Sequence, residues 1–366
     1  GIIANNKYPN ENNNGTNMEN KKYYNKIIFG PTGTGKSHFC SNEAENITAE
    51  NVFRTTFYED YTYYDFFGQY KPVVLRNTGS YIHAPTYSDR NKTVQLAEHR
   101  ITYQFVPGIF FKALLKALIL ENSNDDSEVL LIIEEINRGN CSSIFGDIFQ
   151  LLDRNPDGAS SYSLSLSDDL RRYFVDIRYD ISNISKQDAE YNPFNLKINS
   201  QVILEVLEFI LQKDKLYIPK NLKIIGTMNT SDQSLFPMDS AFKRRWDMQY
   251  SPIDYDEEFL KNVVIGKTNL KWCSTLADIN KIIYEKTKTE DKQIGQWFIK
   301  QENNLISEYE FKNKLISYLY FDVFKHFPEV FNHLPYSILS TLPVIDIVEL
   351  LKKQIKESSI TPNRKK

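Results

Sequence analysis

A phosphate-binding pattern at residues 30–37 constrains the fold of this chain more than any other feature of its sequence. The segment reads Gly-Pro-Thr-Gly-Thr-Gly-Lys-Ser and directly follows the apolar run 27–29, which predicts a β-strand. Glycines let the backbone come close to a phosphate, and the helix that follows presents its positive N-terminal end to the same group. The pattern therefore predicts an α/β protein that holds a nucleotide between a strand and a helix. The residues expected to contact the nucleotide are Gly30, Pro31, Thr32, Gly33, Thr34, Gly35, Lys36, Ser37 and His38.

A pair of acids follows a second predicted strand. Residues 129–133 form a continuous apolar run, typical of a parallel strand buried on both faces, and the run ends in Glu134 and Glu135. Ligands of open parallel sheets bind at the carboxyl ends of the strands. We expect Ser37 and Glu134 to hold Mg²⁺, and Glu135 to orient or deprotonate the attacking water. Lys36 is expected on the β and γ phosphate oxygens. The alternative is an acidic start of the next helix, where negative charge is favoured in any case.

A third predicted strand, residues 222–227, leads into Asn229 and Asp232. An amide at the same edge of the sheet would hold the attacking water, and Asp232 would fix the neighbouring backbone or an arginine. Both residue types also bond their own backbone in ordinary turns. The position after a buried strand is what favours a functional role.

Two consecutive arginines, Arg244 and Arg245, end a short predicted helix further along the chain. Cations at a helix C-terminus complement the helix dipole, which is the plain interpretation. An arginine delivered to a γ-phosphate is the functional alternative, and such a finger raises rates by roughly 10³- to 10⁵-fold. The order of the motifs along the chain favours the second interpretation.

With these pieces in place, residues 22–330 resemble the AAA+ NTPases and, within them, the McrB family. Residues 225–234 read Ile-Gly-Thr-Met-Asn-Thr-Ser-Asp-Gln-Ser, which is similar to the family signature Met-Asn-Thr-Ala-Asp-Arg-Ser. Residues 57–72 and 132–140 match as well, and residues 294–298 resemble a lid motif of the family. The resemblance implies an AAA+ P-loop NTPase core, α/β with a parallel sheet flanked by helices, and a C-terminal helical lid domain.

The resemblance also implies an activity and partners. The McrB family consists of GTP-hydrolysing motors of type IV, modification-dependent restriction systems. We therefore expect GTP hydrolysis with Mg²⁺, a homo-oligomeric ring, expected to be a hexamer, and DNA cleavage by a separate McrC-like nuclease subunit. DNA would be reached indirectly or through an N-terminal reader domain that this sequence lacks. Asn229 matches the first sensor, and Arg244 and Arg245 match the pair that supplies a trans-acting finger, with their roles not separated.

Three positions depart from the family pattern. Glu134 stands where Asp is usual, Gln233 replaces the signature Arg, and Tyr58 replaces a His. Because an amide cannot supply the charge of a guanidinium, hydrolysis is expected to be slow or to depend on a partner. Two other classes of function stay open. A MoxR-type ATP-dependent remodelling ATPase would select ATP, and a nucleotide-gated scaffold would show no turnover.

Composition limits the remaining possibilities. The chain has 366 residues, of which 41% are hydrophobic, so it has enough apolar material for a sizeable core. Its net charge of −3 argues against a large unspecific nucleic-acid surface. The apolar stretch 105–120 is interrupted by Pro107, Lys112 and Lys116, so no membrane span is expected there. The N-terminal residues do not have the charged-then-apolar pattern of a leader, so the cytoplasm is the expected location. The three cysteines are widely spaced and predict neither disulfides nor zinc.

Patterning along the chain predicts four regions: a flexible Asn-rich linker or cloning remnant at 1–21, the α/β nucleotide-binding domain at 22–250, the helical lid at 251–357 and a basic tail at 358–366. Residues 153–216 form an insertion in which one helix, 202–212, is predicted. Position alone makes this insertion a candidate contact for a partner subunit or DNA, and a surface elaboration without a partner is the alternative. The aromatic cluster at 58–70 is interpreted as core or subunit interface in preference to base stacking.

Overall fold

A computed structural model describes residues 24–75, 81–85, 93–97, 100–123, 125–184, 200–232 and 236–360 of the chain. The centre of the molecule is a five-stranded sheet with the strand order β11-β1-β10-β7-β2, and every neighbouring pair in it is parallel. The three strands predicted from apolar runs are all in this sheet as β1, β7 and β10. The strand bounds are β1 Asn25–Gly30, β2 Val52–Thr56, β7 Val129–Glu134, β10 Leu222–Asn229 and β11 Asp247–Tyr250.

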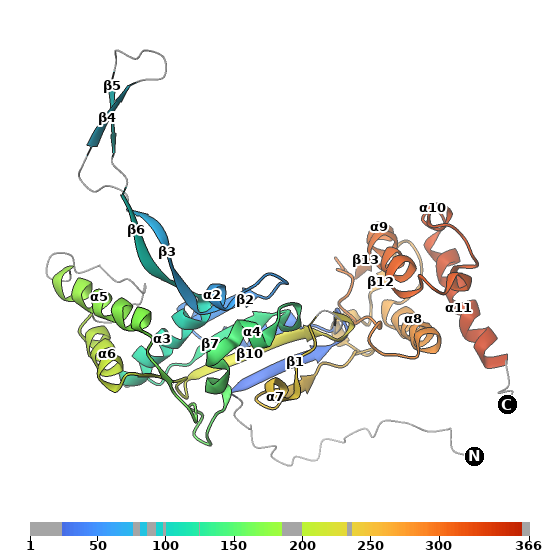
Figure 1. Ribbon diagram of the computed structural model, residues 1–366. Helices are drawn as coiled ribbons and strands as arrows, with labels where there is room; N and C mark the ends of the chain where they lie inside the picture. The colour runs from blue at the N-terminus through green and yellow to red at the C-terminus, as the bar shows by residue number, and fades with distance from the viewer. Residues whose placement is uncertain are drawn as a thin grey trace.

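Helices cover both faces of this sheet (Figure 1). Along β7, Leu131 and its alternate neighbours face the main core, whereas Leu130 and Ile132 face a smaller cluster that contains Cys40 of α1. All five apolar residues of β7 are fully buried, as the continuous apolar run predicts. Burial raises the pKa of the Cys40 thiol to about 12, so this cysteine serves as a neutral packing residue. The helices of this domain are α1 Lys36–Glu45, α2 Tyr63–Phe66, α3 Ile109–Asn122, α4 Cys141–Phe145, α5 Asp168–Ile184, α6 Ser200–Lys213 and α7 Ser240–Lys243.

An arm projects from the main body between α2 and α3 (Figure 1). Its lower part is an antiparallel pair of eight-residue strands, β3 (Gly68–Leu75) and β6 (Arg100–Pro107). A second antiparallel pair, β4 (Tyr81–Pro85) with β5 (Thr93–Ala97), lies further out. The sequence analysis did not predict this arm. At its base, Phe66 and Phe67 of the 58–70 cluster are buried and pack on Phe110, and Phe66 also packs on Phe145, in agreement with the interpretation as core. Tyr58 and Tyr64 of the same cluster are exposed.

The insertion 153–216 contains two long helices, whereas the sequence analysis predicted one. The predicted helix at 202–212 lies within α6, and α5 is the helix that was missed. The two helices pack on each other, and α5 also packs on the base of the arm, where Tyr173 contacts Phe105. The short strands β8 (Leu164–Ser165) and β9 (Lys215–Leu216) pair and close the insertion.

The C-terminal region has a hydrophobic core of its own, which begins at Leu260, whereas the main core ends at Trp246. We propose on this basis that the domain boundary lies near residue 251. Within the part of the chain that the structure describes, no helix is both long and apolar enough to cross a lipid bilayer.

The elements of the C-terminal region are β12 Val264–Ile265, α8 Trp272–Thr287, β13 Leu305–Ile306, α9 Glu308–Glu310, the π-helical turns Phe311–Ile316 and Leu319–Val323, α10 Tyr336–Leu339 and α11 Val344–Ile360. Short 3₁₀ turns span Ala49–Asn51, Ile136–Arg138, Gly146–Leu152, Thr230–Asp232, Glu258–Leu260 and Pro328–Phe331.

Candidate functional site

The phosphate-binding pattern forms the loop between β1 and α1, as predicted. Gly33 and Gly35 have φ angles of +82° and +90°, a backbone conformation that residues other than glycine rarely adopt. The Lys36 side chain is 7% exposed, and its Nζ donates to the carbonyl oxygens of Gly30 and Pro31 at 3.1 and 2.7 Å. These contacts hold the ammonium over the loop. Ser37 and His38 are exposed in the first turn of α1.

Glu134 connects the loop with two neighbouring strands. Its Oε2 accepts hydrogen bonds from the Ser37 hydroxyl at 3.1 Å and from the Thr227 hydroxyl at 2.6 Å. Its Oε1 accepts from Arg54 of β2 at 3.1 Å. A serine hydroxyl beside a carboxylate offers the hard oxygen ligands that Mg²⁺ prefers, so these residues fit the predicted metal role.

Glu135 is held in an unusual backbone conformation next to Asn229. Its φ is +52°, in the left-handed region, where a residue other than glycine costs of order 1–3 kcal/mol and which is over-represented at functional sites. The Asn229 amide Nδ2 donates to both carboxylate oxygens of Glu135, at 2.9 and 3.1 Å. The Glu135 backbone N–H donates to the Thr227 hydroxyl at 3.2 Å. The acid predicted to handle water and the predicted sensor amide are therefore in direct contact.

Strand register explains why residues so far apart in sequence meet here. Gly30 lies opposite Asn229 in the β1–β10 pair, and Gly226 lies opposite Ile133 in the β10–β7 pair. Because all of these strands are parallel, their carboxyl ends share one edge of the sheet. Asp232 ends the 3₁₀ turn that follows β10, and its side chain lies outside the described residues, as does Gln233.

The two arginines lie at the other edge of the sheet and differ from each other. They precede β11, whose first residue, Asp247, pairs with Lys26 near the start of β1. Arg245 is held from three directions, and its side chain is only 8% exposed. It forms an ion pair with Asp153 at 2.7 Å and donates to the Ala241 carbonyl at 2.7 Å. Its guanidinium carbon also lies 4.0 Å from the centre of the Phe149 ring. Arg244 is exposed.

The C-terminal domain is joined directly to the phosphate loop. The Gly295 N–H donates to the Thr32 carbonyl, and the Trp297 N–H donates to the Gly33 carbonyl, both at 2.8 Å. The approach is so close that a Cβ on Gly33 would lie 2.6 Å from the Phe298 backbone. The Trp297 ring lies next to Gly35 and is 38% exposed. The segment 294–298, which resembles the lid motif of the family, thus forms one wall of the loop.

Sequence reasoning missed three residues of this site. Arg54 and Thr227 bond Glu134, and Trp297 was noted only as part of a motif. Thr227 was detectable, because it ends a predicted strand that enters the site. Arg54 and the Trp297 ring depend on tertiary contacts that no local pattern reveals.

A phosphate loop at the edge of a parallel sheet, with an acid pair and an amide beside it and a helical domain against the loop, defines a P-loop NTPase of the AAA+ class. Residues 25–158 match the family described as AAA domain (dynein-related subfamily). The chain is 36% identical over 318 residues to a Bacillus subtilis (strain 168) protein, "Type II restriction enzyme BsuMI component YdiS". This match covers 84% of this chain and 81% of the relative. The chain therefore belongs to the McrB-like AAA+ family. It is also 24% identical over 247 residues to the Escherichia coli (strain K12) "Type IV methyl-directed restriction enzyme EcoKMcrB subunit", covering 66% of this chain and 38% of that protein. The predicted family and fold class are therefore confirmed.

Proposed function

We propose that this chain is the GTP-hydrolysing motor subunit of a McrBC-like type IV restriction system. In this proposal it assembles into a hexameric ring in the cytoplasm and drives DNA cleavage by a separate McrC-like nuclease subunit. The names of the two relatives, one a restriction enzyme component and the other a subunit of a methyl-directed restriction enzyme, support the restriction role.

The main support for the proposed ring is the distance between the two arginines and the other residues of the site. Strand β1 is six residues long, so the two edges of the sheet are ~20 Å apart. Lys36, Glu134 and Asn229 lie at one edge, and Arg244 lies at the other. Since Arg244 cannot reach the phosphate loop of its own chain, we propose that it completes the site of a second copy as the trans-acting finger. Arg245 then positions this helix end through Asp153.

We propose the following roles at the carboxyl edge. Loop backbone N–H groups and Lys36 bind the phosphates, and Ser37 and Glu134 hold Mg²⁺. The metal, when bound, neutralises charge that develops on the phosphate oxygens. Glu135 accepts a proton from the attacking water, and Asn229 keeps the Glu135 carboxylate turned toward that water. Arg54 and Thr227 orient the Glu134 carboxylate, which compensates for the longer side chain that stands where Asp is usual.

Intrinsic fluorescence offers a direct test of nucleotide choice. The chain has three tryptophans, and Trp246 and Trp272 are buried whereas Trp297 lies exposed beside the loop. Titration with GTP and with ATP in the presence of Mg²⁺ should change the Trp297 emission, with saturation at lower GTP concentration. The Trp297→Phe variant, which keeps the backbone contact to Gly33, serves as the control and should lose the signal. Selection of ATP would remove the GTPase assignment and favour the MoxR-type alternative.

Assembly and partnership need separate measurements. Sedimentation velocity with a nonhydrolysable GTP analogue should show an oligomer several times the mass of the chain. If only the monomer sediments at saturating analogue, the shared site is refuted. Turnover measured with the cognate nuclease subunit and modified DNA tests the motor role, and no hydrolysis under those conditions would favour the scaffold alternative.

A further inference from the structure

One face of the lower part of the arm, formed by β3 and β6, is apolar. The antiparallel register pairs Tyr70 with Phe105, Pro72 with Tyr103 and Val74 with Ile101. Because side chains two residues apart share a face, these pairs form one stripe along β3 and β6. The opposite face is mixed and includes Lys71, Gln104 and Thr102. The arm therefore has one face suited to burial.

Only the lower end of this apolar face is covered. Phe105 is buried and packs against Tyr173 of α5, with ring centroids 4.8 Å apart. Further along, Tyr103 and Ile101 are each 70% exposed and Val74 is 55% exposed. Figure 1 shows the arm projecting away from the body of the molecule. A two-stranded ribbon of this kind is marginal in water unless its apolar face packs on something.

The exposed stripe runs into a groove with acidic walls. A cavity of about 260 Å³ lies between the arm residues Tyr70, Tyr103 and Phe105 and the α5 residues Asp176 and Asp180. The two aspartates are one helical turn apart, and like charges at this spacing repel each other. Burial, and then the charge of Asp176, raises the pKa of Asp180. A cation placed between these carboxylates would offset their mutual repulsion.

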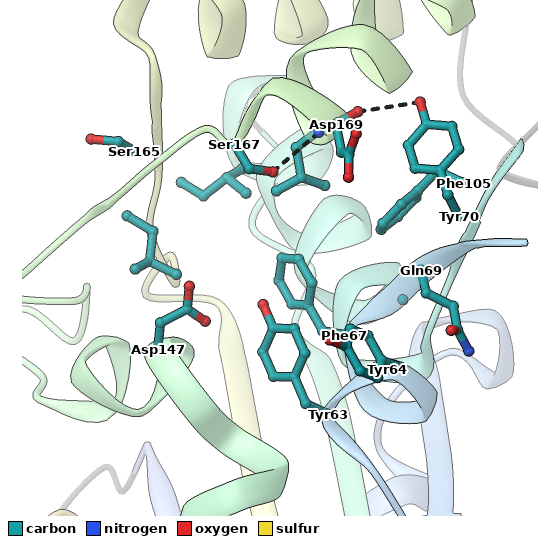
Figure 2. Close-up of a pocket in the computed structure, with 14 residues that line it drawn as sticks. Tyr63, Tyr64, Phe67, Gln69, Tyr70, Phe105, Asp147, Ser165, Ser167 and Asp169 are labelled. Carbon is teal, nitrogen blue, oxygen red and sulfur yellow. Dashed lines mark hydrogen bonds between the residues drawn. The ribbon is translucent and has the colours of Figure 1, made fainter.

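A second cavity continues the same surface on the side of α2. It has a volume of about 350 Å³ and shares the walls Tyr70 and Phe105 with the first. Figure 2 shows Tyr63, Tyr64 and Phe67 around it, with Asp147 facing the Tyr63 hydroxyl and Asp169 near Tyr70. Among the described residues, those that line the two cavities include no lysine or arginine. The charge of Arg172 lowers the pKa of Tyr70, but it acts more weakly than burial and the charges of Asp176 and Asp169, which raise it.

We propose that this surface, formed by the exposed stripe of the arm and the two acidic cavities at its base, is the docking site for a basic amphipathic helix of a separate partner protein. The apolar face of the helix covers Val74, Ile101 and Tyr103, and its lysine or arginine side chains enter the cavities beside Asp176 and Asp180. Aromatic rings next to carboxylates suit such cations through cation–π and ionic attraction together.

Charge complementarity favours this occupant over the others. Nucleic acid would bring phosphates against four aspartates, which repel it, although the tyrosines alone would suit base stacking. A second copy of this chain carries a net charge of −3 and is a poorer electrostatic match than a basic segment. The proposal goes beyond nucleotide hydrolysis and does not depend on it.

The test uses a labelled helical peptide of about 18 residues, with leucine on one face and lysine on the other, and a glutamate counterpart. Fluorescence anisotropy should show saturable binding of the lysine peptide to the full chain. The Ile101→Ser/Tyr103→Ser variant should weaken it about tenfold or more, because truncated aromatic anchors at interfaces typically cost this much. Both residues are exposed, so folding should be retained. The control Val73→Ser, on the other face of the same hairpin, should bind normally.

Charge reversal sharpens the test. Asp176→Lys/Asp180→Lys should weaken the lysine peptide about tenfold and make the glutamate peptide bind, whereas Glu208→Gln on α6 should change neither. Equal binding by all variants, or no saturable binding, would overturn the proposal. So would self-association, or binding of single-stranded DNA, that Ile101→Ser/Tyr103→Ser abolishes. The Trp297 nucleotide titration on the same samples reports the nucleotide site separately, so failure of one proposal is not mistaken for failure of the other.

Discussion

The two edges of the parallel sheet use polar residues in opposite ways. At the carboxyl edge, Glu134 and Glu135 are bonded by side chains from neighbouring strands and from the phosphate loop, so the edge forms one connected polar site. At the amino edge, Arg245 is fixed by Asp153 and Phe149, whereas Arg244 next to it is exposed. This difference is what our proposal rests on, in which the carboxyl edge binds the nucleotide and the amino edge presents Arg244 to a second copy.

The largest expected effect tests the amino edge. Arg244→Ala should lower turnover about 10³-fold or more with little change in nucleotide binding, because a finger acts on charge that develops during hydrolysis. The measurement is steady-state phosphate release by assembled protein. Mixing Arg244→Ala chains with Lys36→Ala chains should restore part of the activity, since some interfaces then combine an intact loop with an intact arginine. A mixture as inactive as its components would count against a site shared between copies.

The next effect tests the carboxyl edge. Glu135→Gln should lower turnover about 10²- to 10⁴-fold, the range for loss of a general base. The amide keeps a hydrogen-bonding oxygen for Asn229, so nucleotide affinity should stay near that of the wild type in the Trp297 titration. Glu128→Gln, which removes a carboxylate that pairs with Lys223 away from the site, is the matched control. An active Glu135→Gln enzyme would refute the water assignment.

A smaller effect is expected for binding at the same edge. Lys36→Ala should weaken nucleotide affinity about 10- to 100-fold, because a charged hydrogen bond contributes about 1.5–3 kcal/mol. The titration of Trp297 fluorescence measures it. Lys223→Ala, which removes an ammonium that pairs with Glu128 away from the site, is the matched control and should bind normally. Unchanged affinity in Lys36→Ala would mean that the nucleotide lies elsewhere.

The smallest effect separates the two arginines by stability. Arg245→Ala should cost about 2 kcal/mol of unfolding free energy, less than a fully buried pair because Asp153 is partly exposed. Arg244→Ala should change stability by less than about 0.5 kcal/mol, as exposed substitutions do. Urea unfolding followed by circular dichroism measures both. Equal losses would show that the two arginines share one structural role.

The sequence predicted the sheet edge well because its signals are local. Apolar runs located β1, β7 and β10, and the residues directly after them were expected to meet once the strands were taken as parallel. These features depend on short stretches of sequence whose residue pattern is compatible with only one type of secondary structure.

The parts that were not predicted depend on contacts between distant segments. In the arm, Pro72 and the polar residues of β3 hide the alternation, which becomes visible only when β6 is paired with it. Helix α5 did carry a signal, because Leu170, Phe174, Ile177 and Ile181 recur at helical spacing and are buried. The roles of Arg244 and Arg245 could not be separated, because only the position of Asp153 and Phe149 distinguishes them.

The pairing of Gly295 and Trp297 with the phosphate loop has a mechanical consequence. Both hydrogen bonds are formed by the main chain, so they persist whatever side chains occupy this segment, provided that position 295 stays small enough for the close approach. A shift of the loop around an incoming triphosphate must therefore pull the C-terminal domain with it. In the ring proposed above, nucleotide binding in each pocket would thus change the orientation of a whole domain relative to the neighbouring copy.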